Sequence, residues 1–157
     1  MRMNSLLFFV ATLASLGAVS GAGDETQAAV RRDTTVLPCV LSQPACRPGF
    51  GPKITYRWDA APMDANYSAF VHIISPDGKT RLQDDHTPPV PTSQWSGRVE
   101  QESLIRVPPE APLGEYRILI GLYDRKTGKR PNLKAGAGVV DAGGGAYQIG
   151  TLTLSAD

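Results

Sequence analysis

The stretch from residue 108 to residue 133, PPEAPLGEYRILIGLYDRKTGKRPNL, constrains the fold of this chain more than any other segment. Its first prolines cannot donate to a β-ladder, and Gly114 permits a tight turn after them. A run of β-forming residues follows at 115–123. Residues 124–128 then carry the polar and glycine signals of a second turn. The stretch therefore predicts a turn, a strand and another turn, a succession typical of an all-β domain.

Similar strand patterns recur along the chain, and none of the segments after the N-terminal region shows a sustained helical period. The 13 prolines and 16 glycines concentrate at the corners between these patterns. Alternation within one pattern places Ile54, Tyr56 and Trp58 on a single face, which we expect to face the core. We therefore predict an all-β antiparallel sandwich. The predicted strands lie at 53–59, 67–75, 80–86, 98–107, 115–123 and 146–154.

Residues 1–22 have the pattern of a secretory signal peptide. An apolar run at 6–19 is followed by small residues at 20–22 that resemble a cleavage site. The run is about 14 residues long, whereas a membrane-spanning helix needs roughly 20. We therefore expect a polar lead-in at 23–32 and one β-sandwich domain at 33–157. The protein is expected to be secreted or periplasmic, with no membrane span after cleavage of the signal peptide.

Charge balance restricts the partners of the chain. The chain has 16 Lys and Arg residues and 15 Asp and Glu residues, and loss of Arg2 with the signal peptide leaves 15 of each sign. A balanced chain without a basic run lacks the electrostatic pattern of a nucleic-acid binder, so we expect no nucleic acid partner. The chain also lacks a phosphate-binding glycine loop and a serine nucleophile elbow, and we expect no cofactor.

The chain has 2 cysteines, Cys39 and Cys46. Export would place both thiols in an oxidising compartment, where an even number of cysteines can pair completely. We predict a disulfide that closes a short loop, and the alternative is two reduced thiols in that loop. A zinc site is not expected, because structural zinc needs four close ligands and no histidine lies nearby.

An ordered set of short motifs covers residues 56–154. In chain order these motifs are YxW, FVHI near PDG, QDDHxPP, PTSxW, VPPxAPxGxY and GLYDxxTGxR. In their order and spacing the chain resembles the immunoglobulin-like β-sandwich modules that occur as accessory domains of exported bacterial carbohydrate-active proteins and of some membrane glycosyltransferases. The resemblance implies an immunoglobulin-like antiparallel β-sandwich of about seven strands. It implies no shared catalytic residues, because such modules occur beside different catalytic domains.

The two histidines, His72 and His86, flank a hairpin signal at 75–79, SPDGK. A three-residue bulged turn would put His72, Asp84 and His86 on one face, where they could bind a divalent metal or perform acid–base chemistry. A two-residue turn would shift the pairing by one residue, which places His72 beside Asp85 and His86 on the opposite face. The sequence leaves the choice between the two registers open. A purely structural role, in which a buried histidine bonds an aspartate, is the stronger alternative to metal binding.

Trp95 follows a proline-rich connection, where its indole could stack against a sugar ring. The alternative, which we favour, is that Trp95 folds back and plugs one end of the sandwich. Trp95 nevertheless remains a candidate for ligand binding, together with the neighbouring corner of Asp84, Asp85 and His86. Asp85 and His86 could equally cap the turn at 87–89 through bonds from side chain to backbone.

These patterns favour a non-catalytic binding or accessory module. A carbohydrate or a carbohydrate-active partner is the ligand class that the resemblance implies. One alternative is a small metal-binding protein or hydrolase that uses His72, Asp84 and His86. Another is an envelope assembly subunit whose sheet edge pairs with a partner protein.

Overall fold

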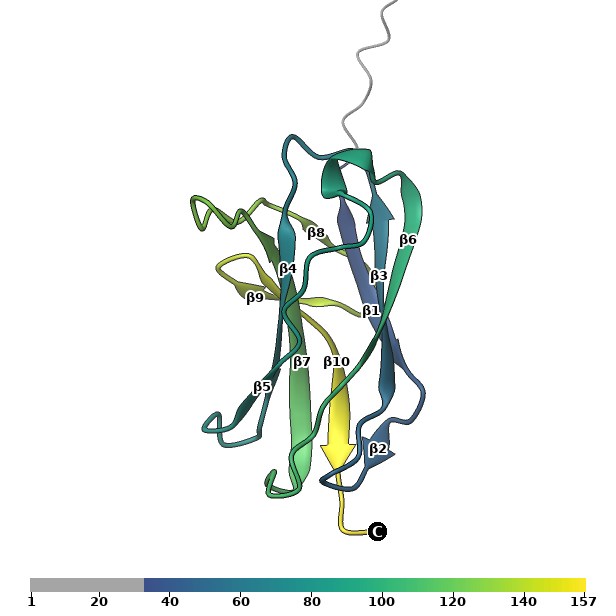
Figure 1. The fold of residues 1–157 in the computed structure, drawn as a ribbon, viewed down its shortest axis with the longest axis vertical. Coiled ribbons are helices and arrows are strands. Elements are labelled where there is room, and N and C mark those ends of the chain that lie inside the picture. Colours follow the sequence, from purple (N-terminus) through teal and green to yellow (C-terminus); the bar gives the residue numbers. More distant parts are fainter. Residues whose placement is uncertain (1–32) are drawn as a thin grey trace, which may run out of the picture. The chain divides into compact units, whose positions relative to one another are not determined.

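A computed structural model describes residues 33–157, so the predicted signal peptide and lead-in lie outside the described residues. The described chain forms two β-sheets that enclose a hydrophobic core (Figure 1). The first sheet contains, in order across it, β6 (Gly97–Leu104), β3 (Lys53–Ala60), β1 (Thr35–Leu41) and β8 (Lys134–Ala135).

The second sheet contains, in order, β2 (Ala45–Cys46), β10 (Ala146–Leu154), β7 (Gly114–Tyr123), β4 (Ser68–Ile74) and β5 (Arg81–Gln83), with β9 (Val140–Gly143) paired to β10. The single helical element of residues 33–157 is a 3-10 turn, η1 (Thr92–Gln94). None of the helical structure in this part of the chain has the length and apolarity that a membrane crossing requires. The predicted all-β class is confirmed.

Most strands that the alternation predicts are confirmed. Residues 53–59, 115–123 and 146–154 coincide with β3, β7 and β10 to within one residue. The predicted strand at 80–86 is shorter in the structure, because β5 keeps only three residues. Strands β2, β8 and β9 have two to four residues each, too few to show a two-residue period in the sequence.

Strand β1 is not predicted from the sequence, because it contains Pro38. The pairing of β1 with β3 shifts between Leu37 and Val40, with Pro38 inside the irregular stretch. Proline has no N–H and is tolerated in a sheet at such a bulge. The bulge breaks the alternation that would mark a strand in the sequence.

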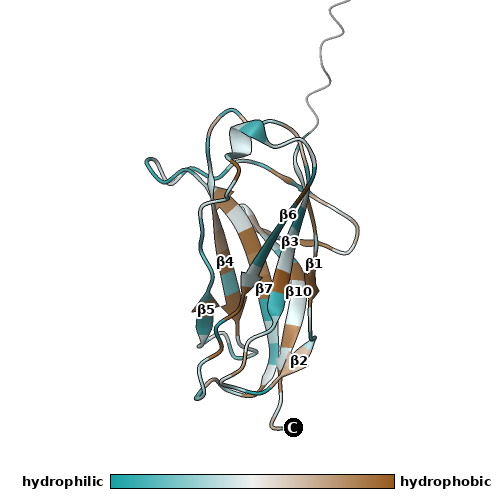
Figure 2. Cartoon of the chain, turned by 45° about the vertical axis from the view of Figure 1, so that its right-hand side comes forward, coloured by the Kyte–Doolittle hydropathy of each residue, from teal (hydrophilic) through white to brown (hydrophobic). Residues whose placement is uncertain are grey.

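The inward faces of both sheets build the core. Ile54, Tyr56 and Trp58 of β3 are 0% exposed, so the predicted core face of this strand is confirmed. Tyr116 and Ile118 of β7 are equally buried on the facing sheet. Figure 2 shows hydrophobic residues along β4, β7 and β10, whereas the outermost strands β5 and β6 are mostly hydrophilic. Burial of this apolar surface is the main force that holds the two sheets together.

A tyrosine fixes the corner before β7. The Tyr116 hydroxyl donates to the carbonyl oxygen of Pro112 (2.8 Å). Between them Gly114 has φ +133°, and a Cβ at this position would lie 2.8 Å from a carbon of Pro76. Only glycine suits both the backbone conformation and the close approach. The proline-rich stretch is therefore locked onto the strand that it introduces.

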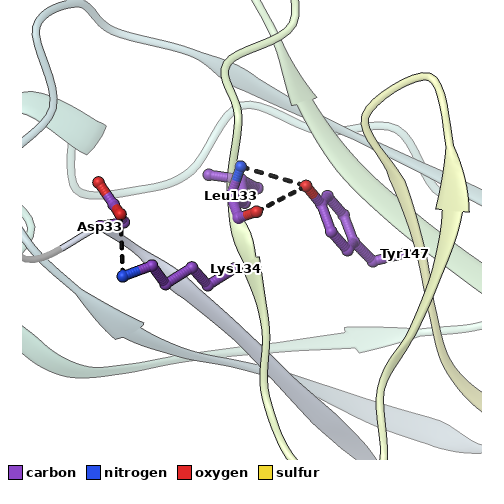
Figure 3. A network of polar contacts seen from close by, with 4 residues as sticks. All are labelled: Asp33, Leu133, Lys134 and Tyr147. Carbon is purple, nitrogen blue, oxygen red and sulfur yellow. Dashed lines mark hydrogen bonds and ion pairs between the residues drawn. The ribbon is translucent and has the colours of Figure 1, made fainter.

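Two long connections carry the chain from the second sheet to the first. Residues 84–96 lead from β5 of the second sheet to β6 of the first. Residues 124–145 lead from β7 to β10 and place β8 beside β1 on the way. Tyr147 holds this second connection, because its hydroxyl accepts from the Leu133 N–H (3.1 Å) and donates to the Leu133 carbonyl (2.8 Å; Figure 3). Both connections therefore join the two sheets.

The predicted disulfide is not formed, since Cys39 and Cys46 are both free. Cys39 belongs to the first sheet, and its Sγ lies only 2.8 Å from where a Cβ on Gly150 would sit. Cys46 belongs to the second sheet and pairs with Leu154, on the same strand as Gly150. Four residues of strand cover roughly 13 Å, whereas the Cα atoms of a disulfide lie within about 7 Å. The two thiols therefore pack at different levels of the sandwich.

We predict that Tyr116→Phe lowers the free energy of unfolding by about 1 kcal/mol, because the corner loses one hydrogen bond to the carbonyl of the exposed Pro112. Urea unfolding followed by tryptophan fluorescence measures the change. Tyr123→Phe is the matched control, since the Tyr123 hydroxyl makes no hydrogen bond within residues 33–157. Equal stability of Tyr116→Phe and the control would show that the corner bond does not stabilise the fold.

Candidate functional site

The loop between β4 and β5 decides which candidate residues can meet. Ser75 donates its N–H to the carbonyl oxygen of Thr80 (2.9 Å), which leaves 76–79 as a four-residue loop. The Asp77 carboxylate accepts from the N–H of Lys79 (3.0 Å) and so holds Lys79 within the loop. The loop is therefore longer than either the three-residue or the two-residue turn considered from the sequence.

This register separates His72 from the other candidates. His72 pairs with Gln83 and shares the outer face of the second sheet with Asp85. Asp84 and His86 lie on the inner face. The first of the two registers, with its shared face for His72, Asp84 and His86, is therefore wrong, and the observed pairing is that of the second. Among residues 33–157 no group of three His, Cys, Asp or Glu side chains could hold a metal ion.

Asp84 and His86 join a polar cluster between the sheets. The Tyr56 hydroxyl donates to Asp84 Oδ2 (2.6 Å), and the His86 ring stacks on the Tyr56 ring with centroids 5.4 Å apart. His86 Nδ1 lies 2.8 Å from the Asp84 carbonyl oxygen, and its Nε2 lies 3.2 Å from Gln101 Oε1. Burial, with help from the Asp84 carboxylate, raises the pKa of Tyr56 far above its usual value. The cluster ties β3, β6 and the connection at 84–96 together.

Asp85 serves the backbone of the neighbouring strand. Its Oδ1 accepts from the N–H of Val71 (2.8 Å), beyond the point where β5 ends. A bond from side chain to backbone was one of the roles expected for this corner, but its partner is β4 and not the turn at 87–89. The Asp85 carboxylate takes the place of a strand carbonyl as the acceptor for the Val71 N–H.

Trp95 is a core residue. Its side chain is 1% exposed, its Nε1 donates to the carbonyl oxygen of Val90 (2.9 Å), and its ring centroid lies 5.2 Å from that of Trp58. The expectation that Trp95 plugs the sandwich is confirmed. The use of Trp95 as a stacking surface for a sugar is wrong, because a ligand outside the domain cannot reach a ring buried to this extent.

The outer face of the second sheet carries an exposed row of side chains instead. Ile74 of β4 pairs with Arg81 of β5 on one side and with Arg117 of β7 on the other. Both arginines are exposed, and Ile74 is half-buried between them. Along the same face the next row is Gln83, His72 and Leu119. An open hollow at this end of the sheet is lined by Ile74, Gly78, Lys79, Arg81 and Gln83.

The far end of this face is closed by an arginine. Phe70 points outward from β4, yet it is only 4% exposed, because the Arg130 guanidinium lies 4.1 Å from its ring centroid. Arg130 also donates to the carbonyl oxygen of Gly144 (2.8 Å). A Cβ at Gly121 would lie 2.3 Å from the Phe70 ring, so glycine makes room for it. The exposed part of the face therefore begins at His72.

Comparison of the chain with models of protein families gives no match, and comparison with curated proteins gives none either. The candidate site therefore rests on the geometry alone.

Sequence reasoning missed the pair Arg81 and Arg117. The alternation at 115–123 places Arg117 on the face opposite Tyr116, so the outward position of Arg117 could be predicted from the sequence. Arg81 and Ile74 join it only through the register of the β4–β5 hairpin, which the sequence left open between two choices.

We predict that Tyr56→Phe and Asp84→Ala each lower the free energy of unfolding, by about 1–3 kcal/mol, because each leaves a buried polar partner unsatisfied. The double variant should lose less than the sum of the single losses, since both remove the same bond. Urea unfolding of the four proteins measures the coupling. Strictly additive losses would show that the bond between Tyr56 and Asp84 contributes nothing to stability.

We predict that His72 titrates below its ordinary pKa of 6.5. Burial lowers the pKa of the ring, and the nearby Arg81 guanidinium lowers it further, against an opposing effect of Asp85. Arg81→Gln should therefore raise the pKa of His72, whereas Arg98→Gln on the other sheet should leave it unchanged. An NMR titration of the imidazole protons measures both. An unchanged His72 pKa in Arg81→Gln would contradict the placement of Arg81 beside it.

Proposed function

We propose that the described domain is an immunoglobulin-like sandwich. Its strand order supports this, because β1, β3 and β6 correspond to strands A, B and E, and β10, β7, β4 and β5 to strands G, F, C and C′. The hydrogen bond from Tyr116 to the Pro112 carbonyl, near the start of the strand that corresponds to F, supports it independently. A tyrosine corner at this place is a hallmark of the immunoglobulin fold.

Within that fold we infer a non-catalytic binding or accessory module that acts after export, in the periplasm or outside the cell. The observation that carries this proposal is the outer face of the second sheet, where Arg81, Ile74 and Arg117 form an exposed row beside a hollow. The carboxylates of Asp84 and Asp85, by contrast, are engaged in bonds that hold the fold. The exposed side chains, and not the buried polar cluster, are free to meet a ligand.

A carbohydrate is the ligand class that suits this face. The half-buried Ile74 offers an aliphatic surface for the C–H face of a sugar ring, and Gln83 offers both a donor and an acceptor for hydroxyl groups. Apolar contact combined with a few fixed polar groups is the usual composition of a small-ligand site. The order of the sequence motifs, which resembles that of accessory domains of carbohydrate-active proteins, points to the same ligand class.

A glycan array with the domain comprising residues 33–157 tests the proposal. We expect reproducible binding to at least one glycan, and about tenfold weaker binding in Gln83→Ala, which trims an exposed side chain at the hollow. Thr55→Ala on the first sheet is the control and should bind as the unaltered protein does. Absence of binding to every glycan, or equal binding by Gln83→Ala, would contradict the proposal.

A second candidate function rests on β6, which forms one edge of the first sheet. Its eight residues pair with β3 without a bulge, and an unpaired edge of this length can accept a strand from a partner protein. Glu100→Pro would remove an outward-facing edge N–H without touching the ladder with β3. If the protein is an envelope assembly subunit, this variant should no longer form a complex with the protein that adds a strand to β6, which size-exclusion chromatography measures. Circular dichroism should show that the variant keeps its fold.

A further inference from the structure

We propose that the ligand of this face is an acidic glycan, specifically one whose sugar units carry a carboxylate. The inference rests on the proposed function, since it names the charge of the carbohydrate that the outer face of the second sheet would bind. The residues that carry it are Arg81, Ile74 and Arg117, which lie side by side on three neighbouring strands.

The register sets the spacing of the two arginines. Directly opposed residues of an antiparallel pair have Cβ atoms about 5 Å apart, so Arg81 and Arg117 start roughly 10 Å from each other with Ile74 between them. Both guanidinium groups can therefore approach one ring that rests on Ile74, or two successive rings of a chain. Each guanidinium presents a planar set of donors that matches a carboxylate bidentately.

The positive charges of this face lack partners within the described chain. Neither of the two ion pairs among residues 33–157 involves Arg81, Arg117 or Lys79. Lys79 lines the hollow beside Arg81 and adds a third positive group. An anion that binds here would not have to displace an existing ion pair.

Three acidic residues lie in the same region, and none of them forms an ion pair with Arg81 or Arg117. Asp85 accepts the Val71 N–H, and Asp77 accepts the Lys79 N–H within the loop. Glu115 remains, but it lies toward the end of the sheet, two residues beyond Arg117 and paired with Thr153. The row itself carries two guanidinium groups and no carboxylate, so a group seated on Ile74 meets positive charge first, which favours an anionic ligand over a cationic one.

A carboxylate fits the row better than a sulfate ester. In a uronic acid the carboxylate is bonded directly to a ring carbon, so a ring seated on Ile74 holds its charge beside the flanking arginines. A sulfate ester holds its charge farther from the ring, because an ester oxygen intervenes.

Isothermal titration calorimetry with an oligogalacturonate of about six units tests the proposal. The comparison ligands are a neutral glucan of the same length and a sulfated glucan. We expect the oligogalacturonate to bind more tightly than either, and binding to weaken at least tenfold in Arg81→Gln and in Arg117→Gln. Arg81→Lys should restore only part of the affinity, because lysine keeps the charge but not the bidentate geometry.

Arg98→Gln is the matched control, since Arg98 is an exposed arginine of the first sheet. Equal weakening by this control would indicate unspecific attraction and overturn the inference. Preference for the neutral or the sulfated ligand would also overturn the inference, while leaving the proposed carbohydrate function intact. Failure of every glycan to bind would overturn both. Circular dichroism of each variant distinguishes loss of binding from loss of fold.

Discussion

The hydrogen bond from the Tyr56 hydroxyl to Asp84 joins two parts of the fold that hydrophobic burial alone would not hold in register. Tyr56 belongs to the first sheet, and Asp84 stands where the chain leaves the second sheet to cross to the first. A short bond to a carboxylate in a buried setting is stronger than one between neutral groups. His86 stacks on the same tyrosine and reaches Gln101, so the crossing segment is anchored to two strands of the first sheet.

The motifs that stand out in the sequence act mainly on one another. Asp84, in the motif QDDHxPP, accepts a hydrogen bond from Tyr56, in the motif YxW. Asp85, in the same motif as Asp84, accepts one from the backbone N–H of Val71, in the motif FVHI. The arginine that ends GLYDxxTGxR, Arg130, covers Phe70 of FVHI. The motifs therefore serve mainly to hold the scaffold together. Residues that hold each other in place leave the ligand contacts to other positions, here Arg81 and Arg117.

What the sequence could not supply is pairing between strands. Alternation shows which residues of one strand share a face, but it does not show which residue lies opposite on the next strand. The hairpin has a four-residue loop at 76–79, in which Asp77 accepts the Lys79 N–H, and the register that goes with this loop separates His72 from Asp84 and His86. The short strands β2 and β8 were missed for a related reason, because their positions depend on partners far along the chain. Strand β9 pairs with the neighbouring β10, but its glycine-rich sequence shows no strand pattern.

The four-residue loop at 76–79 has an evolutionary consequence. If one residue of this loop were deleted, β5 could slide by one residue along β4. The slip would exchange the inner and outer side chains of β5, so Leu82 would leave the core and Arg81 would enter it. Insertions and deletions in this hairpin should therefore be rare among descendants of this sequence. The long connection at 124–145 carries no such constraint at its exposed turn around Gly128, where length can vary without moving a strand.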